Sequence, residues 1–202
     1  MDKKADKKTV EKTIDALQAR NINALYVETG NEAKKKVLEL IPKGAEVMTM
    51  TSVTLSSLGI PDIINESGDY DAVKPKLLKM DRATQSLDMQ KIGAAPEWSI
   101  GSVHAVTQEG NVVIASNTGS QLPGYLYGSQ HVIWVVGTQK IVKDLDTAMK
   151  RIYDYILPLE SVRLNKQYNT TSGSNVSKIA IVNKEFNPKR VTLIFVNEVL
   201  GF

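Results

Sequence analysis

The stretch Ser99–Gly137 reads SIGSVHAVTQEGNVVIASNTGSQLPGYLYGSQHVIWVVG and carries the strongest structural signals of the chain. Two short apolar runs, Val103–Thr107 and Val112–Ala115, flank Gln108–Asn111, whose residues are typical of a tight turn. This pattern predicts a β-hairpin. The later run His131–Val136 is almost continuously apolar and is only long enough for a strand that is buried on both faces.

A polar loop follows the predicted hairpin. It places small hydrogen-bonding side chains around one glycine, and its candidate ligand-binding residues are Asn117, Thr118, Gly119, Ser120 and Gln121. Such a loop can direct hydroxyls and backbone N–H groups at an anion or a carbonyl oxygen. The alternative is a tight connection that binds no ligand, ahead of a short helix that begins at Pro123.

The segments before this stretch alternate between helical and strand-like patterns. Apolar residues recur at i, i+4 and i+7 near the N-terminus, which predicts an amphipathic helix over about 7–20. A strand over Ala24–Val27, a helix over Glu32–Ile41 and a strand over Ala45–Met50 then form a βαβ unit. We expect its two strands to be parallel, with a right-handed crossover.

The remaining segments complete an α/β pattern. We expect an irregular segment over 60–73, helices over 76–80, 81–92 and 144–157, a mobile polar loop over 163–178, and strands over 179–182 and 191–196. Pro158 is expected to stop the helix that precedes it. The sequence therefore predicts one domain over 1–202, a three-layer α/β fold with a mostly parallel sheet and one antiparallel hairpin.

Composition excludes several classes of function. The 202 residues include 25 Lys and Arg against 22 Asp and Glu, and the lysines near the N-terminus and at 34–36 are not interleaved with aromatic residues, so no nucleic-acid partner is expected. There is no cysteine, and the two histidines lack metal-ligand spacing, so we expect no metal site. No apolar run approaches the ~18–20 residues of a membrane span, and no signal segment is apparent, which predicts a cytoplasmic protein without membrane contact.

A second group of candidate ligand-binding residues follows the strand that ends at Met50. Thr51 or Ser52 can cap a helix there, and the carboxyl ends of parallel strands are where open α/β sheets tend to bind ligands. Lys140 and Lys143 precede a predicted helix and would add positive charge to the same rim. Together with loop 117–121 these residues predict a site for a phosphate or a carboxylate. The alternative is helix capping and solvated lysines.

The order of these features resembles the LUD-domain family (lactate utilisation, LutC/YkgG-like). The resemblance is carried by four segments, MTMTSVTLSSLGI, SVHAVTQEGNVVIASNTGSQ, VIWVVGTQKIVKDLDTAMKRI and VTLIFVNEVLGF. It implies the NagB/RpiA/CoA-transferase-like fold, which glucosamine-phosphate deaminases, ribose-phosphate isomerases and formyltetrahydrofolate cyclo-ligases share. It also implies iron–sulfur and oxidase subunits as partners in the oxidation of L-lactate. Related members carry a cysteine cluster where this chain has YNTTSGSNVS, so no iron–sulfur cluster is expected in the chain itself.

Two residues are candidates for catalysis. Glu109 is a candidate nucleophile because CoA transferases, which have the fold that the resemblance implies, use a glutamate. The alternative is that Glu109 is a solvated residue of the turn. His104 is a candidate general base. The alternative is a structural histidine on a strand, which faces a polar crevice or has its hydrogen bonds satisfied in the core. His131 opens a strand and is interpreted as structural.

Three functions stay open at this point. The first is a small-molecule-binding protein associated with lactate or other organic-acid utilisation, whose crevice includes the loop at 117–121. The second is a non-catalytic interaction subunit of an iron–sulfur oxidase complex. The third is a cyclo-ligase-like ATP-dependent enzyme, although no P-loop is present. The cofactor, the catalytic status and any homo-oligomer are left open.

Overall fold

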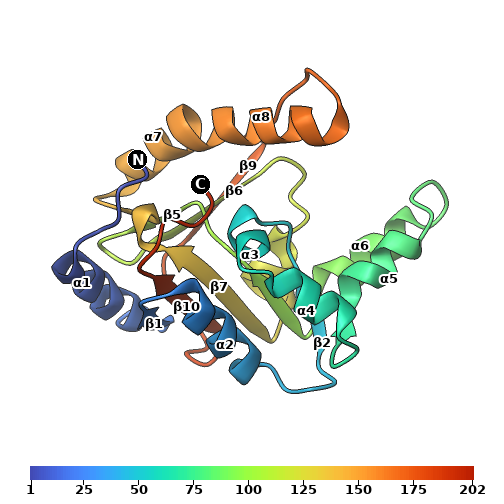
Figure 1. Ribbon diagram of the computed structural model, residues 1–202, viewed down its shortest axis with the longest axis horizontal. Coiled ribbons are helices and arrows are strands. Elements are labelled where there is room, and N and C mark those ends of the chain that lie inside the picture. Colours follow the sequence, from blue (N-terminus) through green and yellow to red (C-terminus); the bar gives the residue numbers. More distant parts are fainter.

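A six-stranded parallel sheet forms the centre of the molecule, which a computed structural model describes over all residues, Met1–Phe202 (Figure 1). The strand order is β1-β10-β7-β4-β2-β3, and every neighbouring pair is parallel. The strands are β1 (Asn23–Val27), β2 (Glu46–Thr49), β3 (Asp71–Ala72), β4 (Trp98–Gly101), β7 (His131–Gly137) and β10 (Val191–Val196). The expected α/β fold with a mostly parallel sheet is confirmed.

A second, four-stranded sheet has the order β8-β5-β6-β9. Its strands are β5 (Ala105–Thr107), β6 (Val112–Ser116), β8 (Ile141–Val142) and β9 (Lys178–Val182). The predicted hairpin is β5–β6, which is antiparallel, and Gly110 adopts the φ of +86° that its tight turn requires. The hairpin therefore belongs to a separate sheet, in which β9 pairs antiparallel with β6 and β8 pairs parallel with β5.

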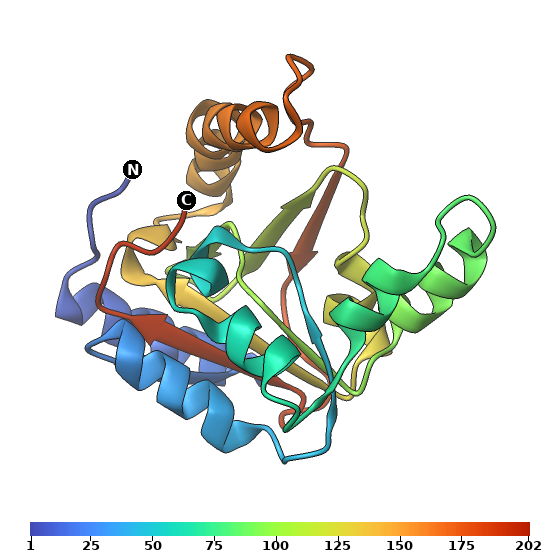
Figure 2. The same ribbon diagram turned by 45° about the vertical axis from the view of Figure 1, so that its right-hand side comes forward.

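Helices cover both sides of these sheets. The α-helices are α1 (Lys7–Gln18), α2 (Gly30–Leu40), α3 (Val53–Ser57), α4 (Ile60–Glu66), α5 (Val73–Lys79), α6 (Ser86–Ala94), α7 (Leu145–Arg151) and α8 (Leu157–Tyr168). Two π-helices, η1 (Gly124–Gly128) and η3 (Ile152–Ile156), and one 3₁₀ turn, η2 (Thr138–Lys140), complete the chain. Figure 2 shows α7 and α8 on the opposite side of the molecule from α2.

The core is divided by the central strand β7, whose alternate side chains enter different clusters. Trp134 and its neighbours on one face pack with α1 and with the inner face of the second sheet. Ile133 and Val135 on the other face pack with α2, α3 and α4. A third cluster joins the outer face of the second sheet to α7 and η3. The apolar run of β7 is buried on both faces, as its sequence predicted.

The βαβ unit forms with one difference from expectation. β1 and β2 are parallel in the same sheet, but β10, β7 and β4 lie between them. The helix between them begins with a capping box, in which Thr29 accepts a hydrogen bond from the Glu32 backbone and the Glu32 side chain accepts from the Thr29 backbone. Local signals thus located the helix, whereas strand order depends on packing partners distant in the sequence.

The prediction that a helix ends at Pro158 is wrong. The loop predicted over 163–178 is also wrong in its first part, because residues 163–168 are helical. The chain passes from α7 through η3 into α8 and remains helical to Tyr168. A proline interrupts the hydrogen bonding of a regular α-helix, and here a wider π turn precedes it. In this turn the Leu157 N–H donates to the carbonyl of Ile152, five residues back. Pro158 therefore lies in the first turn of α8, where its missing N–H is tolerated. Asn169 then ends α8 in the left-handed conformation, with φ of 48°.

Two other boundaries differ from the sequence-based expectations. The segment 60–73, expected to be irregular, contains α4. This helix has Pro61 in its first turn, where proline is favoured. The helix expected over 81–92 begins only at Ser86, because the carboxylate of Asp81 accepts hydrogen bonds from the Ala83 backbone and the Thr84 hydroxyl and so holds a turn. Strand β4, which no pattern had indicated, precedes the hairpin.

The α5–α6 hairpin projects from the body of the molecule (Figures 1 and 2). None of the residues of α6 is buried, and Leu78 and Leu87 are 78% and 63% exposed. None of the helices in the chain is long and apolar enough to cross a membrane.

The residue Gly137, at the end of β7, provides a test of the packing that fixes η2. A Cβ at this position would lie 2.6 Å from the Glu198 carbonyl oxygen and 2.9 Å from the Leu200 nitrogen, which are backbone atoms that cannot rotate away. We expect Gly137→Ala to lower the free energy of unfolding by about 1–3 kcal/mol, the usual cost of overpacking.

The measurement is urea unfolding of the variant beside Gly93→Ala. The added Cβ of the control meets only Leu77 Cδ1, at 3.6 Å, and lies in a helix, so it should stabilise by up to about 1 kcal/mol. Equal unfolding midpoints for Gly137→Ala and the wild type would contradict the packing described here.

Candidate functional site

A cleft of about 330 Å³ lies where the chain leaves the carboxyl ends of β2, β4 and β7. Its walls are the start of α3, the chain between β4 and β5, the loop that follows β6, and the η3–α8 helix. The edge of an open parallel sheet at which strands end is the usual ligand-binding position in α/β proteins. The volume suits a small metabolite rather than a macromolecule.

Lys140 lies in this cleft and is only 2% exposed. Its ammonium nitrogen donates hydrogen bonds to Thr54 Oγ1 at 3.0 Å and to Ser102 Oγ at 3.1 Å. No carboxylate neutralises it. Burial, followed by the positive charge of Arg151, lowers the pKa of Lys140 from 10.5 to about 7.

A second buried cation lies behind the cleft. Arg151 is 1% exposed, donates from Nε to the His104 carbonyl at 3.1 Å, and also donates to the Met1 carbonyl, while its Nη2 has no hydrogen-bond partner. Its guanidinium lies 5.0 Å from the centroid of the Tyr155 ring. A guanidinium stays charged even where burial lowers its pKa, so Arg151 maintains a positive potential in this region at any ordinary pH.

His104 lines the cleft, and both cations are close enough to act on its ring. Burial first, and then the charges of Lys140 and Arg151, lower the pKa of His104 to about 3. Its Nδ1 accepts a hydrogen bond from the Ala115 backbone at 3.1 Å, so the neutral ring carries its proton on Nε2. The geometry favours His104 as a hydrogen-bond donor rather than as the general base that its sequence context suggested.

The structure brings most of the predicted ligand-binding residues to the same cleft. Its lining includes Thr51, Ser52, Asn117, Thr118, Ser120 and Gln121. Ser52 caps α3 by accepting from the Leu55 backbone, so its predicted capping role is confirmed. Gly119 does not line the cleft but adopts φ of +88°, which allows the loop to turn.

The loop is held mainly by its own hydrogen bonds, with one further bond from Ser177 Oγ to Asn117 Oδ1 at 3.2 Å. Ser116 accepts from the Gly119 backbone at 2.8 Å and donates to Gln121 Oε1 at 2.9 Å. Gln121 in turn donates to the Ala115 carbonyl at 3.2 Å. These bonds leave Thr118 and Ser120 exposed at the rim of the cleft.

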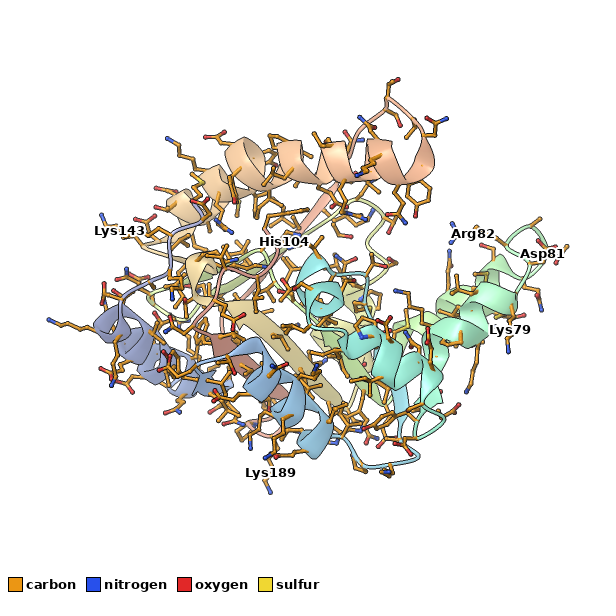
Figure 3. All side chains as sticks on the ribbon, in the orientation of Figure 1. Lys79, Asp81, Arg82, His104, Lys143 and Lys189 are labelled. Atoms are coloured by element: carbon orange, nitrogen blue, oxygen red, sulfur yellow. The ribbon has the colours of Figure 1, made fainter.

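Two predicted site residues lie away from the cleft. The side chain of Lys143 is 83% exposed beside Asp144 and extends from the outside of the molecule in Figure 3, whereas His104 lies near its centre. Glu109 is exposed in the hairpin turn, where its carbonyl accepts from Arg20 at 2.7 Å. The solvated alternatives for both residues match these positions.

Several cleft residues were not predicted, namely Thr54, Ser102, Tyr125, Glu160 and Arg163. Arg163 donates from Nε and Nη2 to the two carboxylate oxygens of Glu160 on α8, and Arg163 lies in the segment that was expected to be loop. Arg151 was also missed, although it follows the buried Ala148 at the i, i+3 spacing of one helical face. That spacing is the signal that would have indicated its burial.

No cluster of three or more His, Cys, Asp or Glu side chains in the chain is arranged to hold a metal ion. The cleft instead contains hydroxyls, amides and cations, and its acidic side chain, Glu160, is paired with Arg163. This donor set suits the oxygen atoms of an organic anion.

The lowered pKa of Lys140 predicts a pH dependence of stability. The unfolded chain retains this proton up to about pH 10.5, whereas the folded chain releases it near pH 7, so the free energy of unfolding should rise as pH rises between about 7 and about 10. His104 should add a similar rise between about pH 3 and about pH 6.5. The measurement is the melting temperature as a function of pH. We expect Lys140→Met to lose the rise in stability between about pH 7 and pH 10 and to keep the rise between about pH 3 and pH 6.5.

The matched control is Lys143→Met, which removes an exposed lysine three residues away and should leave both rises in place. Parallel curves for the wild type and Lys140→Met above pH 7 would contradict the lowered pKa of Lys140.

Comparison with known proteins identifies a family and a similar fold. The LUD domain family model matches residues 10–196. The crystal structure of a DUF162 family protein from Deinococcus radiodurans is similar over 94% of this chain and 97% of that one, with a TM-score of 0.58 and 9% identity. The structure of a D-ribose-5-phosphate isomerase in complex with phospho-erythronic acid matches over 83% of this chain and 94% of the isomerase chain, with a TM-score of 0.43 and 11% identity. The ribose 5-phosphate isomerase from Plasmodium falciparum has the same coverages, a TM-score of 0.40 and 10% identity.

No curated protein sequence matches the chain. The family model spans nearly its whole length, from α1 to the last residue of β10. The chain belongs to the LUD domain family.

Proposed function

We propose that the cleft binds a small organic anion, a carboxylate or a phosphate. The observation that carries the proposal is the buried side chain of Lys140, whose charged form has two hydroxyl partners and no counter-charge. A buried cation is costly unless it is paired, and the oxygen atoms of a bound anion would supply the missing partner. Arg151, whose Nη2 has no partner, adds to the positive potential.

The rim of the cleft supports the same ligand class. Thr51, Thr118 and Ser120 offer hydroxyls at the rim, and Lys74 donates to Thr51 Oγ1 at 3.5 Å from the side of α5. Burial lowers the pKa of Lys74, which has no carboxylate partner either. Short donors at the rim and cations below it are suited to orient a ligand that has one charged end.

The metabolic context proposed for this activity is the use of lactate or another organic acid. Its support is the name of the family and the resemblance of the four sequence segments described above. Lactate and pyruvate are therefore the first ligands to test, and both are small enough for a cleft of about 330 Å³.

The experiment is a thermal-shift screen of the purified chain with lactate, pyruvate, sugar phosphates, folates, acyl-CoA and ATP. A ligand at 100 times its Kd should stabilise the folded state by about 2.7 kcal/mol. We expect one carboxylate or phosphate compound to raise the melting temperature of the wild type and of Lys143→Met, but not that of Lys140→Met.

Each other outcome has a definite meaning. A shift that is equal in Lys140→Met would show that binding does not use the buried ammonium. The absence of a shift with every compound would overturn the proposal. A shift with ATP together with a folate would favour the cyclo-ligase-like enzyme instead.

A second candidate function, that of an interaction subunit, is favoured by the α5–α6 hairpin. Its exposed leucines Leu78 and Leu87 lie on a projection that the core of the molecule does not use. The neighbouring η1 exposes Tyr127, which is 92% exposed. Large exposed apolar side chains that are grouped together are characteristic of interaction surfaces.

Co-purification with iron–sulfur and oxidase subunits tests this candidate. We expect the double substitution Leu78→Ser and Leu87→Ser to abolish co-purification, because burial of each side chain contributes about 1.5–3 kcal/mol. Val162→Ser changes a side chain that is 67% exposed on α8 and serves as the control. Co-purification that survives the double substitution would exclude the hairpin as the contact.

A further inference from the structure

The hydrogen bonds around Lys140 limit its protonation chemistry. Thr54 donates its hydroxyl proton to the Leu200 carbonyl at 3.0 Å, so Thr54 Oγ1 can only accept from Lys140. Ser102 directs its hydroxyl towards the Val103 carbonyl at 3.5 Å, so it too accepts from Lys140. Two N–H bonds of Lys140 are therefore used by the protein.

A neutral amine has two N–H bonds and one lone pair, so these two acceptors satisfy its donors completely. No third protein acceptor is available to the ammonium form. Glu160 is the carboxylate of the cleft, and both of its oxygens are bound to Arg163. His104 presents a protonated Nε2, and Arg151 is itself a cation. The surroundings thus favour an amine whose lone pair is free.

We propose that Lys140 is a nucleophile that forms an imine with the carbonyl carbon of a bound 2-oxo acid or of a similar carbonyl compound. The inference rests on the proposed function, since the carboxylate or phosphate of that compound has to be held in the same cleft. Arg151 keeps its charge while Lys140 is neutral, and the rim hydroxyls of Thr51 and Ser120 remain free to donate to the anionic end.

The step balances without a further reactant. The Nζ lone pair forms a bond to the carbonyl carbon and gives a carbinolamine. The carbonyl oxygen then leaves as water with the two protons that the amine carried, and a carbon–nitrogen double bond remains. A lysine buried beside another cation is a recurring way of activating an amine for this reaction. The lowered pKa of Lys140 leaves a substantial fraction of the amine neutral near pH 7.

Reductive trapping tests this inference on the full chain. The protein is incubated with pyruvate or with dihydroxyacetone phosphate, reduced with sodium cyanoborohydride, and analysed by intact mass and peptide mapping. We expect one adduct per chain, with a mass gain equal to the carbonyl compound less one oxygen atom, on the peptide that contains Lys140. Lys143→Met should react like the wild type, and Lys140→Met should give no adduct at this position.

Peptide mapping of the wild type does not depend on the folding of any variant. An adduct that maps only to exposed lysines, or no adduct at all, would overturn the inference. If the thermal shift is present without an adduct at Lys140, anion binding stands and imine formation fails. If neither is observed, both fail. The yield of the adduct should increase several-fold between pH 6 and pH 8, as Lys140 loses its proton.

Discussion

The hydrogen bond between Lys140 and Ser102 joins two places where the chain passes from the parallel sheet to the second sheet. The first passage connects β4 to β5 and the second connects β7 to β8. These strands are neighbours in both sheets, since β4 pairs with β7 and β5 pairs with β8. The two passages therefore run side by side, and Ser102, His104 and Lys140 come together although the lysine is nearly forty residues further along the chain.

The chain after β10 fixes the second passage. The Leu200 carbonyl accepts from Gln139 at 2.9 Å and from Thr54 at 3.0 Å, and so bridges η2 and α3. Gly137 leaves no space for a side chain beside Glu198 and Leu200. Lys140 is thus held by backbone packing on both sides, and burial without an acidic partner lowers its pKa to about 7.

Much of the fold could be predicted from local patterns, but the site only in part. The apolar run of β7, the hairpin turn and the cap at Ser52 depend on neighbouring residues, and all three formed as expected. The position of loop 117–121 at the cleft could also be predicted, because the loop directly follows a strand, β6. Lys140 and Lys143, in contrast, look alike in the sequence, and only tertiary packing buries one and exposes the other. The continuation of α8 past Pro158 depended on a π turn that has no simple sequence signal.

The division of the molecule into two sheets has a consequence for the shape of the cleft. One wall, at α3, packs on the parallel sheet, and the opposite wall includes η3, which packs on the second sheet and continues into α8. No ladder of backbone hydrogen bonds joins the two sheets, which meet through apolar side chains. A small sliding motion between them would change the width of the cleft while every strand kept its partners. The width of the cleft is therefore set by side-chain packing between the two sheets, which substitutions remote from the cleft can adjust.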